Sequence, residues 1–416
     1  MPAMVLKFGH LTLVHDAICE SPLVAGAGEL RLLLAASRVP FSSVDENSAQ
    51  EIPGDAVDGD RLLGMAAWHG LAPLLLRYLE QQPNASLPDN VLPALRQSAR
   101  QAALHNLALA SELLSISRHL RAREIEHLAY KGPLLASHLY GTRALRVSAD
   151  LDIVVPRQRL LPACQTLAEL GFVDKIGFTS SQRAAAFRFG FEHTFSRGGI
   201  DVDLHWRLVP TFVSPSLDER GVWQRAVEAP LFGAMVPTLC PEDLLLALCL
   251  HAGQHEWMHL SSFCDLHQML IRHPRLRWEI VRRHLGDSNT ARTVLVSLCL
   301  LRKHWNSRIP EDFRERISSD SEVQRIANTV ESNFWPASDV PVPRDTSIGW
   351  LLQRTRREPW LDRLRYIAGI ALNPTTIDYE TFKLPRPLIA LYPLFRGARL
   401  ALQRSRIVRP RSSPAP

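Results

Sequence analysis

The chain has 416 residues, 46% of them hydrophobic, and a formal net charge of +6, which suits a globular protein of two or three domains. No stretch reaches the roughly 18 uninterrupted apolar residues of a membrane span, and Met1 to His15 lack the order of segments found in a secretion signal. The six cysteines include no Cys-x-x-Cys pair, so we expect reduced thiols in the cytoplasm and neither a disulfide framework nor a zinc ribbon.

The positive charge is unevenly distributed along the chain. Residues 341–416 hold 14 Lys and Arg against 5 Asp and Glu, a balance of +9, so the first 340 residues sum to −3. The excess of positive charge therefore belongs to the C-terminal tail and not to the rest of the protein.

Residues 1–124 are predicted to form an N-terminal helical region. Apolar positions recur at three- and four-residue steps from Leu62 to Leu79 and from Val91 to Leu120, as they do on one face of a helix. A stretch rich in Ser, Asp and Glu, from Pro40 to Gly59, predicts a loop before these helices.

Residues 125–240 change character and predict a small mixed α/β core. Glu126 to Tyr130 predicts a strand, and Pro133 to Tyr140 a helix that Gly141 closes, because proline suits a first helical turn and glycine a helix end. A second helix is predicted from Gln158 to Leu170.

A hairpin should complete this core. Its strands are predicted over Phe187 to Ser196 and Ile200 to Leu208, with Arg197-Gly198-Gly199 at the turn.

The helical period returns in residues 241–333, where Pro241-Glu242-Asp243 gives the acidic first turn that a helix N-terminus favours. Residues 334–416 are predicted to be a basic tail rich in Pro and Arg, with an amphipathic helix near Leu388 to Arg404. The fold class is thus α+β, a small mixed sheet flanked by helical regions at both ends.

Three aspartates are the most informative residues of the core. Asp150 and Asp152 are two apart in an otherwise apolar strand, so their carboxylates can face one point, and Asp203 follows on a later strand. Like charges on a buried strand need a positive partner, and Mg²⁺ prefers such oxygen ligands. All three are predicted metal ligands and catalytic residues of a two-metal site for phosphoryl or nucleotidyl transfer.

Residues that could bind a nucleotide surround this strand. Lys131 and Gly132 stand at a strand-to-helix turn, where the helix N-terminus favours an anion. Arg146 and Ser148 lead into the acidic strand and could contact a triphosphate. A lysine before a glycine turn is commonplace, however, and carries little weight alone.

Other interpretations of the same residues remain open. Asp150 and Asp152 could be a solvated strand end or a loop cap, and Asp201 competes with Asp203 as the third acid because both face the same way. His205 and Trp206 are more simply explained by packing and hydrogen bonding in the core.

Together these residues resemble a little-characterised bacterial nucleotidyltransferase family within the DNA polymerase beta-like nucleotidyltransferase superfamily. The resemblance extends from Asp60 to Leu301 and is strongest between Lys131 and Leu208. The segments that carry it are Tyr130-Lys131-Gly132, Leu135-Ala136, Tyr140-Gly141, Arg146 to Val155, Asp203 to Leu208, Pro241 to Leu246, Cys249 to Ala252 and Asp265-Leu266.

The resemblance implies a small mixed sheet with helices on one face, and Mg²⁺-dependent transfer of a nucleoside monophosphate from an NTP such as ATP, as in EC 2.7.7 enzymes. It assigns Asp150 and Asp152 to the acidic pair and Asp203 to the third acid. Lys131-Gly132 replaces the Gly-Ser phosphate turn of the wider superfamily. The acceptor would be a hydroxyl of an unidentified small molecule, saccharide, peptide or protein, and nucleic acid is not expected as a partner.

Two alternatives come from other parts of the chain. His251 and His255, four apart on a helix, could bind zinc in a metal hydrolase, but Ala252 stands where the protease motif needs glutamate, and the pair could instead line the nucleotide site. A non-catalytic protein could bind nucleotides, nucleic acid or an anionic membrane through the arginine-rich tail, whose simplest role is a solubilising surface. Peripheral contact of the tail with the inner membrane surface is the membrane role that we consider.

Overall fold

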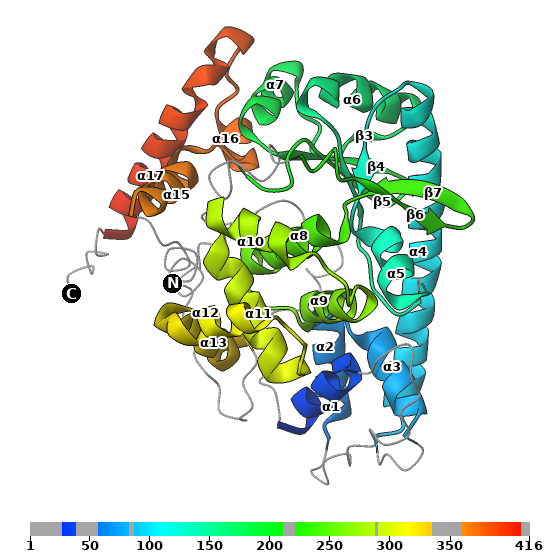
Figure 1. The fold of residues 1–416 in the computed structure, drawn as a ribbon. Helices are drawn as coiled ribbons and strands as arrows, with labels where there is room; N and C mark the ends of the chain where they lie inside the picture. Colours follow the sequence, from blue (N-terminus) through cyan, green and yellow to red (C-terminus); the bar gives the residue numbers. More distant parts are fainter. Residues whose placement is uncertain are drawn as a thin grey trace, which may run out of the picture.

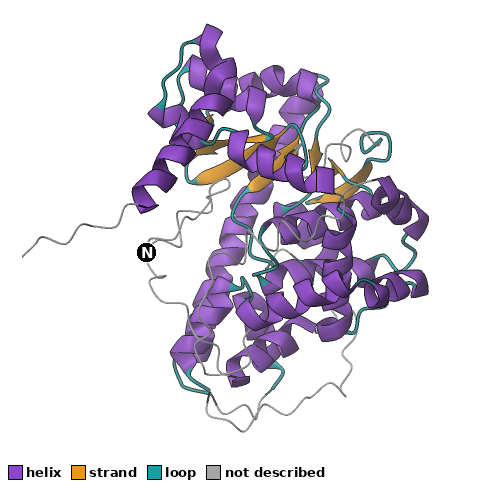
Figure 2. Cartoon of the chain, turned by 90° about the vertical axis from the view of Figure 1, so that its left-hand side faces the viewer, coloured by secondary structure: helices purple, strands orange, loops and turns teal. Residues whose placement is uncertain are grey.

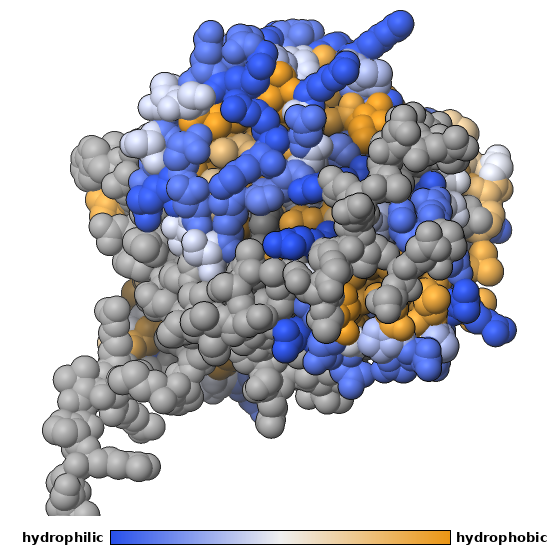
Figure 3. Space-filling model, turned by 90° about the horizontal axis from the view of Figure 1, so that it is seen from below, coloured by the Kyte–Doolittle hydropathy of each residue, from blue (hydrophilic) through white to orange (hydrophobic). Residues whose placement is uncertain are grey.

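The computed structural model describes residues 27–38, 57–82, 87–142, 144–210, 221–287, 290–334 and 360–408. Most of the predicted loop from Pro40 to Gly59 lies outside the described residues. No helix among the described residues is both long and apolar enough to cross a membrane. Seen from below, the described surface mixes hydrophilic areas with smaller hydrophobic ones (Figure 3).

The N-terminal region is helical, as predicted. Its helices are α1 (Ala27–Arg38), α2 (Gly59–Trp68), α3 (Ala72–Glu80) and α4 (Val91–Ala122), and the long α4 runs along one side of the molecule (Figure 1). The apolar period from Leu62 to Leu79 is divided between α2 and α3 because Gly70 adopts a left-handed conformation, with φ of +67°.

A mixed five-stranded sheet forms the centre of the predicted core. Its order is β1-β2-β5-β4-β3, and β2 pairs with β5 in parallel whereas the other neighbours are antiparallel. In this order the strands are Leu128–Ala129, Leu151–Val154, Ile200–His205, Glu192–Arg197 and Val173–Asp174. The fold class is therefore the predicted mixture of helices and a small mixed sheet.

Two helices of this core were predicted from the sequence, and a third was missed. The predicted helices are α5 (Gly132–Tyr140) and α6 (Leu160–Glu169), which follows the 3-10 turn η1 (Arg157–Arg159). The missed helix is α7 (Ser180–Phe189). Gly141 ends α5 with φ of +67°, as its position in the sequence predicted. The predicted strand from Phe187 is wrong in its first residues, since helix α7 continues to Phe189 and β4 begins at Glu192.

The two faces of the sheet differ in chemistry. Leu151 and Ile153 of β2, with Val202 and Leu204 of β5, pack into one apolar cluster with residues of α4 and α6. Because side chains alternate along a strand, the acidic residues of β2 and β5 turn to the opposite face. Figure 2 shows the strands between helices on either side.

A second, two-stranded sheet was missed by sequence reasoning. It pairs β6 (Val227–Leu231) with β7 (Ala234–Thr238). Pro230 and Pro237 lie within these strands and argue against a strand in the middle of a sheet, but a two-stranded ribbon has only edges and tolerates them.

The predicted helical region after the core is confirmed. It consists of α8 (Pro241–Gln254), α9 (Leu260–Arg272), α10 (Trp278–Asp287), α11 (Ala291–Trp305), α12 (Glu311–Ser319) and α13 (Ser321–Phe334). Residues of α8, α9 and α11 share one hydrophobic core with residues of the N-terminal helices. Segments far apart in the sequence thus support each other around α8.

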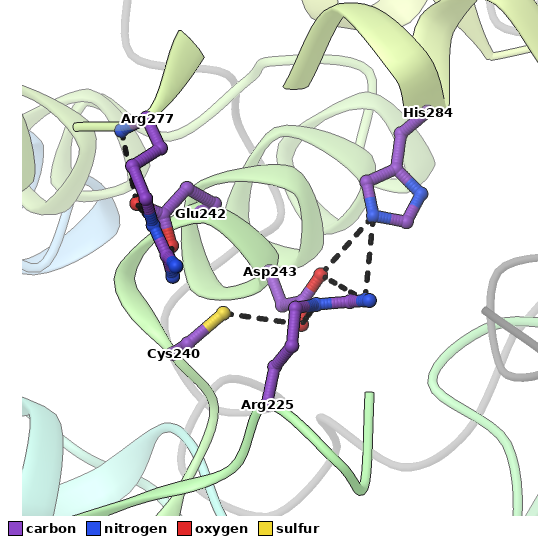
Figure 4. Close-up of polar contacts among 6 residues, drawn as sticks. All are labelled: Arg225, Cys240, Glu242, Asp243, Arg277 and His284. Atoms are coloured by element: carbon purple, nitrogen blue, oxygen red, sulfur yellow. Dashed lines mark hydrogen bonds and ion pairs between the residues drawn. The ribbon is translucent and has the colours of Figure 1, made fainter. Parts of the chain in front are cut away.

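A buried polar cluster holds the N-terminus of α8 (Figure 4). Asp243, whose side chain is 1% exposed, accepts hydrogen bonds from Nε and a terminal nitrogen of Arg225, both at 2.9 Å, and from the Cys240 thiol at 3.2 Å. His284 Nε2 of α10 lies 3.3 Å from the same carboxylate. We call this cluster the α8 clamp, and it joins α8 to α10 and to the segment before β6.

The C-terminal segment packs against the core instead of standing apart from it. It comprises α15 (Trp360–Leu372), α16 (Thr376–Thr381), the 3-10 helix η2 (Arg386–Leu391) and α17 (Tyr392–Val408), beside α7 (Figure 1). Ser181 of α7 donates a hydrogen bond to the Leu384 carbonyl, and Gln182 donates one to the Tyr379 carbonyl.

Two arginines of the predicted basic tail are internal. Arg396 and Arg399 of α17 both form ion pairs with Asp378 of α16, at 3.0 and 2.6 Å, and Asp378 is fully buried. Arg396 itself is only 3% exposed. Their charges therefore neutralise Asp378 within the C-terminal segment.

Candidate active site

The acidic residues of β2 and β5 meet across neighbouring strands. The parallel register places Asp152 beside Asp203 and Val154 beside His205. Asp152 is 4% exposed, whereas Asp203 is partly exposed. Asp150 lies in a bend just before β2 and is also partly exposed. Asp150 and Asp203 thus bring charge to the surface beside the buried Asp152.

The Lys131-Gly132 turn approaches the chain directly before β2. Gly132 has φ of +62°, and a Cβ on it would stand 3.0 Å from the carbonyl oxygen of Asp150. Only glycine combines that conformation with that close approach at low cost. Gly132 thereby sets how near α5 can come to Asp150.

Lys131 is the cation nearest to the acids. Its Nζ lies 2.7 Å from Oδ1 of Asp152, and its side chain is 12% exposed. Burial opposes the charge on Lys131, but Asp152 raises the pKa of the ammonium, so it stays protonated. The phosphate-binding lysine predicted from the sequence is thus paired with an acid of the site.

His205 joins two carboxylates. Its Nε2 lies 3.1 Å from Oδ1 of Asp152, and its Nδ1 lies 3.3 Å from Oε2 of Glu192. The hydrogen bond to Asp152 and the nearby carboxylates raise the pKa of this imidazole against the opposing effect of burial. His205 therefore belongs to the polar site, although its ring also meets Tyr130 edge-on.

Glu192 is a further acid of this face that sequence reasoning missed. It pairs with His205 across β4 and β5, and Thr194, two residues on, donates a 2.5 Å hydrogen bond to Asp203. The signal was present in the hairpin, because counting back from the Gly198-Gly199 turn places Glu192 opposite His205.

The proximity of these acids alters their titration. Burial and the charges of neighbouring carboxylates raise the pKa of Asp150 to about 7, and burial raises that of Glu192 to about 7. Burial also raises the pKa of Asp203. Burial acts in the same direction on Asp152, but Lys131 and His205 outweigh it and hold its pKa well below the usual range. Such divergence among neighbouring carboxyls is typical of a functional site.

Three side chains of this face could hold a metal ion. Ligand atoms of Asp152, Asp203 and His205 lie within 4.8 Å of one another. Oδ2 of Asp152 is buried and has no hydrogen-bond partner among the described residues. A buried carboxylate oxygen left in this way is suited to a cation. Asp150, predicted as a metal ligand, is not in this group of three.

The family of the chain follows from comparison with known proteins. A family described as uncharacterised nucleotidyltransferase matches residues 55–306, more than half of the chain. The chain belongs to this family. The resemblance from Asp60 to Leu301 falls within the matched residues, and the chain is therefore classed as a transferase.

More distant comparisons add little to this nucleotidyltransferase assignment. A crystal structure of an antigenic nucleotidyltransferase-like protein from Paracoccidioides brasiliensis matches 48% of this chain and 93% of its own, at 14% identity and a TM-score of 0.30. No curated protein matches the chain.

Two other residues with a predicted role in this nucleotidyltransferase contact each other. Arg146 donates from Nε to both oxygens of Asp265, at 3.0 and 2.9 Å, and from a terminal nitrogen to Ser148 Oγ at 3.1 Å. Tyr140 also donates to Asp265, at 2.7 Å. Arg146 is thus tied to α9. Burial lowers the pKa of this guanidinium, but Asp265 and, to a smaller extent, Tyr140 and Asp152 raise it above its usual value.

The rival third acid of the nucleotidyltransferase core has another partner. Asp201 forms an ion pair with Lys175 and pairs with Ser196 across β4 and β5, one pleat away from Asp203. Asp203, by contrast, stands beside Asp152 in the parallel register. The arrangement places Asp203, not Asp201, next to Asp152 of β2.

The two histidines that suggested a zinc hydrolase lie near the acidic site. Their rings, at His251 and His255 on α8, are 4.6 Å apart. Among the described residues the metal-ligating group of three does not include them. Burial and the positive charge of Lys131 lower the pKa of both imidazoles, that of His255 to about 4.

A hollow of about 740 Å³ lies elsewhere in the molecule. Its lining comes from the end of α11, from α12 and from the loop between them, and includes Arg302, Ile309 and Glu315. None of the candidate nucleotidyltransferase residues lines it.

Proposed function

We propose that this protein transfers a nucleoside monophosphate from an NTP to a hydroxyl of an acceptor and releases pyrophosphate, in the manner of EC 2.7.7 enzymes. The observation that carries the proposal is the pairing of Asp152 with Asp203 on parallel strands, beside Lys131. One buried oxygen of Asp152 also has no hydrogen-bond partner in the described part of the chain. Membership in the nucleotidyltransferase family supports the same reaction class.

Each residue has a role that its position supports. Asp150, Asp152 and Asp203 are the proposed ligands of two Mg²⁺ ions, and His205 is available beside them. Magnesium, when bound, would supply charge that stabilises the transferring phosphoryl group. Asp203, partly exposed and hydrogen-bonded to Thr194, would orient the acceptor hydroxyl.

The phosphate chain would be bound beside Asp152, at the Lys131-Gly132 turn. Lys131 offers an ammonium there, and the first turn of α5, beginning at Gly132, offers backbone N–H groups to an anion. Arg146 and Ser148 would support this turn, since Arg146 also donates to the Gly132 carbonyl at 3.5 Å. We also propose that this family is a branch of the DNA polymerase beta-like nucleotidyltransferase superfamily, because an acidic pair is followed by a third acid on a later strand.

The test is pyrophosphate release by the purified full-length protein with each labelled NTP, Mg²⁺ and fractions of host lysate, which also identifies the acceptor class. Asp150→Asn, Asp152→Asn and Asp203→Asn should each lower the rate more than about a hundredfold, because an interaction with the transition state is lost. Asp201→Asn is the matched control and should stay within about threefold of the wild type.

Two results would contradict the proposal. One is pyrophosphate release that survives the loss of Asp152, and the other is wild-type protein that neither binds nor turns over any NTP. A large effect of Asp201→Asn with none of Asp203→Asn would reassign the third acid.

We further propose that the protein acts in the cytoplasm and touches the inner membrane surface through η2 and α17. Leu388, Leu391 and Leu394 are 45%, 37% and 66% exposed at three-residue steps, and Lys383 and Arg386 beside them are exposed. Exposed leucines near basic residues favour an anionic bilayer. A double variant with Leu391→Ser and Leu394→Ser should co-sediment less with anionic vesicles than the wild type does. Equal recovery of the variant and the wild type with the vesicles would refute the contact.

A further inference from the structure

His205 is a buried histidine whose two ring nitrogens face different carboxylates. Its Nε2 lies 3.1 Å from Oδ1 of Asp152, and its Nδ1 lies 3.3 Å from Oε2 of Glu192. The residue is only 2% exposed, and the rings of Tyr130 and Phe191 lie beside it, with centroids 5.9 and 6.1 Å away. The imidazole is thus confined to an orientation in which Nε2 points toward Asp152.

The strand register brings a second carboxylate to the same place. Asp203 and His205 are two residues apart on β5, so their side chains share a face of the sheet, and Asp152 is the partner of Asp203 on β2. Ligand atoms of these three residues lie within 4.8 Å of one another. Two ligand atoms of one divalent ion, each about 2.1 Å from it, lie about 3 Å apart. The 3.1 Å between His205 Nε2 and Asp152 Oδ1 matches that spacing.

The charges around His205 leave room for a divalent cation. Three carboxylates lie around it, those of Asp152, Glu192 and Asp203. The ammonium of Lys131, 2.7 Å from Asp152 Oδ1, offsets one of their charges, so two negative charges are left when the imidazole is neutral. Oδ2 of Asp152 is buried and has no hydrogen-bond partner in the described part of the chain. A buried oxygen in that condition is suited to a cation.

We propose that His205 binds a divalent metal ion through Nε2, together with Asp152 and Asp203, and that this site prefers a transition-metal ion to Mg²⁺. Mg²⁺ takes oxygen ligands, whereas an imidazole nitrogen suits transition-metal ions. One of the two ions of the proposed nucleotidyl transfer would then have a nitrogen ligand. The inference rests on that proposed function for what the ion does, but the binding of the ion is measured without a nucleotide.

Glu192 is the positioning residue of this metal site. A histidine that binds a metal usually donates its other ring N–H to a carboxylate, which fixes both its tautomer and its orientation. The hairpin register places Glu192 directly opposite His205, and its Oε2 faces Nδ1. Strands β4 and β5 run side by side (Figure 1), so this pair stands on the sheet and not on a loop. A ring held in this way keeps Nε2 for the ion.

The experiment measures the binding of Mn²⁺ and of Mg²⁺ to metal-free, full-length protein without a nucleotide. Mn²⁺ is a conservative probe, because it generally binds most weakly among the first-row divalent transition ions. Its binding is followed by electron paramagnetic resonance, and that of Mg²⁺ by competition with Mn²⁺. The wild-type protein should bind Mn²⁺ at least about tenfold more tightly than Mg²⁺.

Two substitutions separate a nitrogen ligand from a hydrogen bond. His205→Gln keeps an N–H donor for Asp152 but offers an oxygen, which Mg²⁺ accepts, in place of the nitrogen. It should weaken Mn²⁺ binding about ten- to hundredfold and Mg²⁺ binding by less than about threefold. Glu192→Gln should weaken Mn²⁺ binding about tenfold and Mg²⁺ binding much less, because the nitrogen ligand depends on this carboxylate for its orientation. His193→Gln is the matched control and should change neither affinity, since His193 is a buried histidine of β4 whose Nε2 lies 2.9 Å from Asp174.

A second measurement uses the wild-type protein and covers the case in which a variant fails to fold. Pulsed electron paramagnetic resonance detects a nitrogen bound directly to Mn²⁺, and isotope labelling of the histidines assigns that nitrogen to an imidazole. The nitrogen coupling should be present in wild-type protein at one equivalent of Mn²⁺ and absent in His205→Gln.

The outcomes distinguish this inference from the function on which it rests. Wild-type protein that shows no nitrogen coupling to Mn²⁺, or no preference for Mn²⁺, overturns the role of His205, whatever the protein does with an NTP. A coupling that persists in His205→Gln, or an equal loss of Mn²⁺ affinity in His193→Gln, also overturns it. Equal weakening of both ions by Glu192→Gln would overturn the positioning role of Glu192. A coupling that His205→Gln abolishes, in a protein that binds no NTP, supports the metal site and refutes the nucleotidyl transfer.

Discussion

Gly132→Ala tests the contact that sets the distance between α5 and the acidic strand. Gly132 has φ of +62°, and a Cβ there would stand 3.0 Å from the Asp150 carbonyl oxygen. Gly177 is a matched control, with φ of +72° and nothing within 4 Å of the added atom. The two substitutions therefore share the conformational cost and differ only in the close approach.

The magnitudes follow from that difference. Gly177→Ala should lower the free energy of unfolding by about 1–2 kcal/mol, the cost of a left-handed conformation with a Cβ. Gly132→Ala should lower it by about 1–3 kcal/mol more, because the backbone of Asp150 must move aside. A displacement near 1 Å in the catalytic acid should also slow nucleotidyl transfer about a hundredfold.

The assay pairs urea unfolding of both variants with pyrophosphate release under identical conditions. Equal destabilisation by the two substitutions, together with full activity of Gly132→Ala, would refute the idea that this glycine positions Asp150. Loss of activity in Gly177→Ala but not in Gly132→Ala would show that Gly177, and not Gly132, matters for the position of the acids.

Three further predictions concern titration and buried ion pairs. Because burial raises the pKa of Asp150 and Glu192 to about 7, the folded protein holds protons between about pH 4.5 and 7 that the unfolded chain has released. The free energy of unfolding of the metal-free protein should then fall as pH rises through this window and become constant above it. In Asp150→Asn this free energy, measured by urea unfolding, should depend less on pH, and the same slope as in the wild type would contradict the prediction. Asp243→Ala should lower the free energy of unfolding in urea by about 3–5 kcal/mol, because it leaves the α8 clamp without its carboxylate. Asp312→Ala, which breaks an exposed ion pair, should lower it by less than about 1 kcal/mol. Similar losses in the two variants would argue against the clamp. Asp378→Ala should speed proteolysis within residues 360–408, since it leaves two guanidinium groups without their carboxylate, and unchanged cleavage would show that the packing does not depend on it.

Local signals in the sequence were sufficient to predict several helices and strands around the site. Pro133 near the start of α5 and Gly141 at its end act through backbone constraints that need no distant partner. Pro241 and the acidic turn after it located α8 for the same reason. The alternation of acidic and apolar residues along β5 correctly predicted which side chains share a face.

Features that depend on residues brought together by the fold were not predictable in this way. Glu192 joins the site only because the hairpin register places it beside His205. The tail's arginines show as charge in the sequence, but nothing local reveals that Arg396 ends in a buried pair with Asp378. The assignments of the three aspartates to catalysis, and of Lys131, Gly132, Arg146 and Ser148 to nucleotide binding, stay predictions until the variants are measured.

Helix α7 contacts the C-terminal segment at its start and leads toward strand β4 at its end. Ser181 and Gln182 fasten that segment to the start of α7, and only Gly190 and Phe191 separate the other end of this helix from Glu192. Residues 360–408 are therefore joined through α7 to the strand that carries Glu192. Removing residues 360–408 would not simply trim a charged appendage, because it would also remove the contacts that support α7 next to the acidic face.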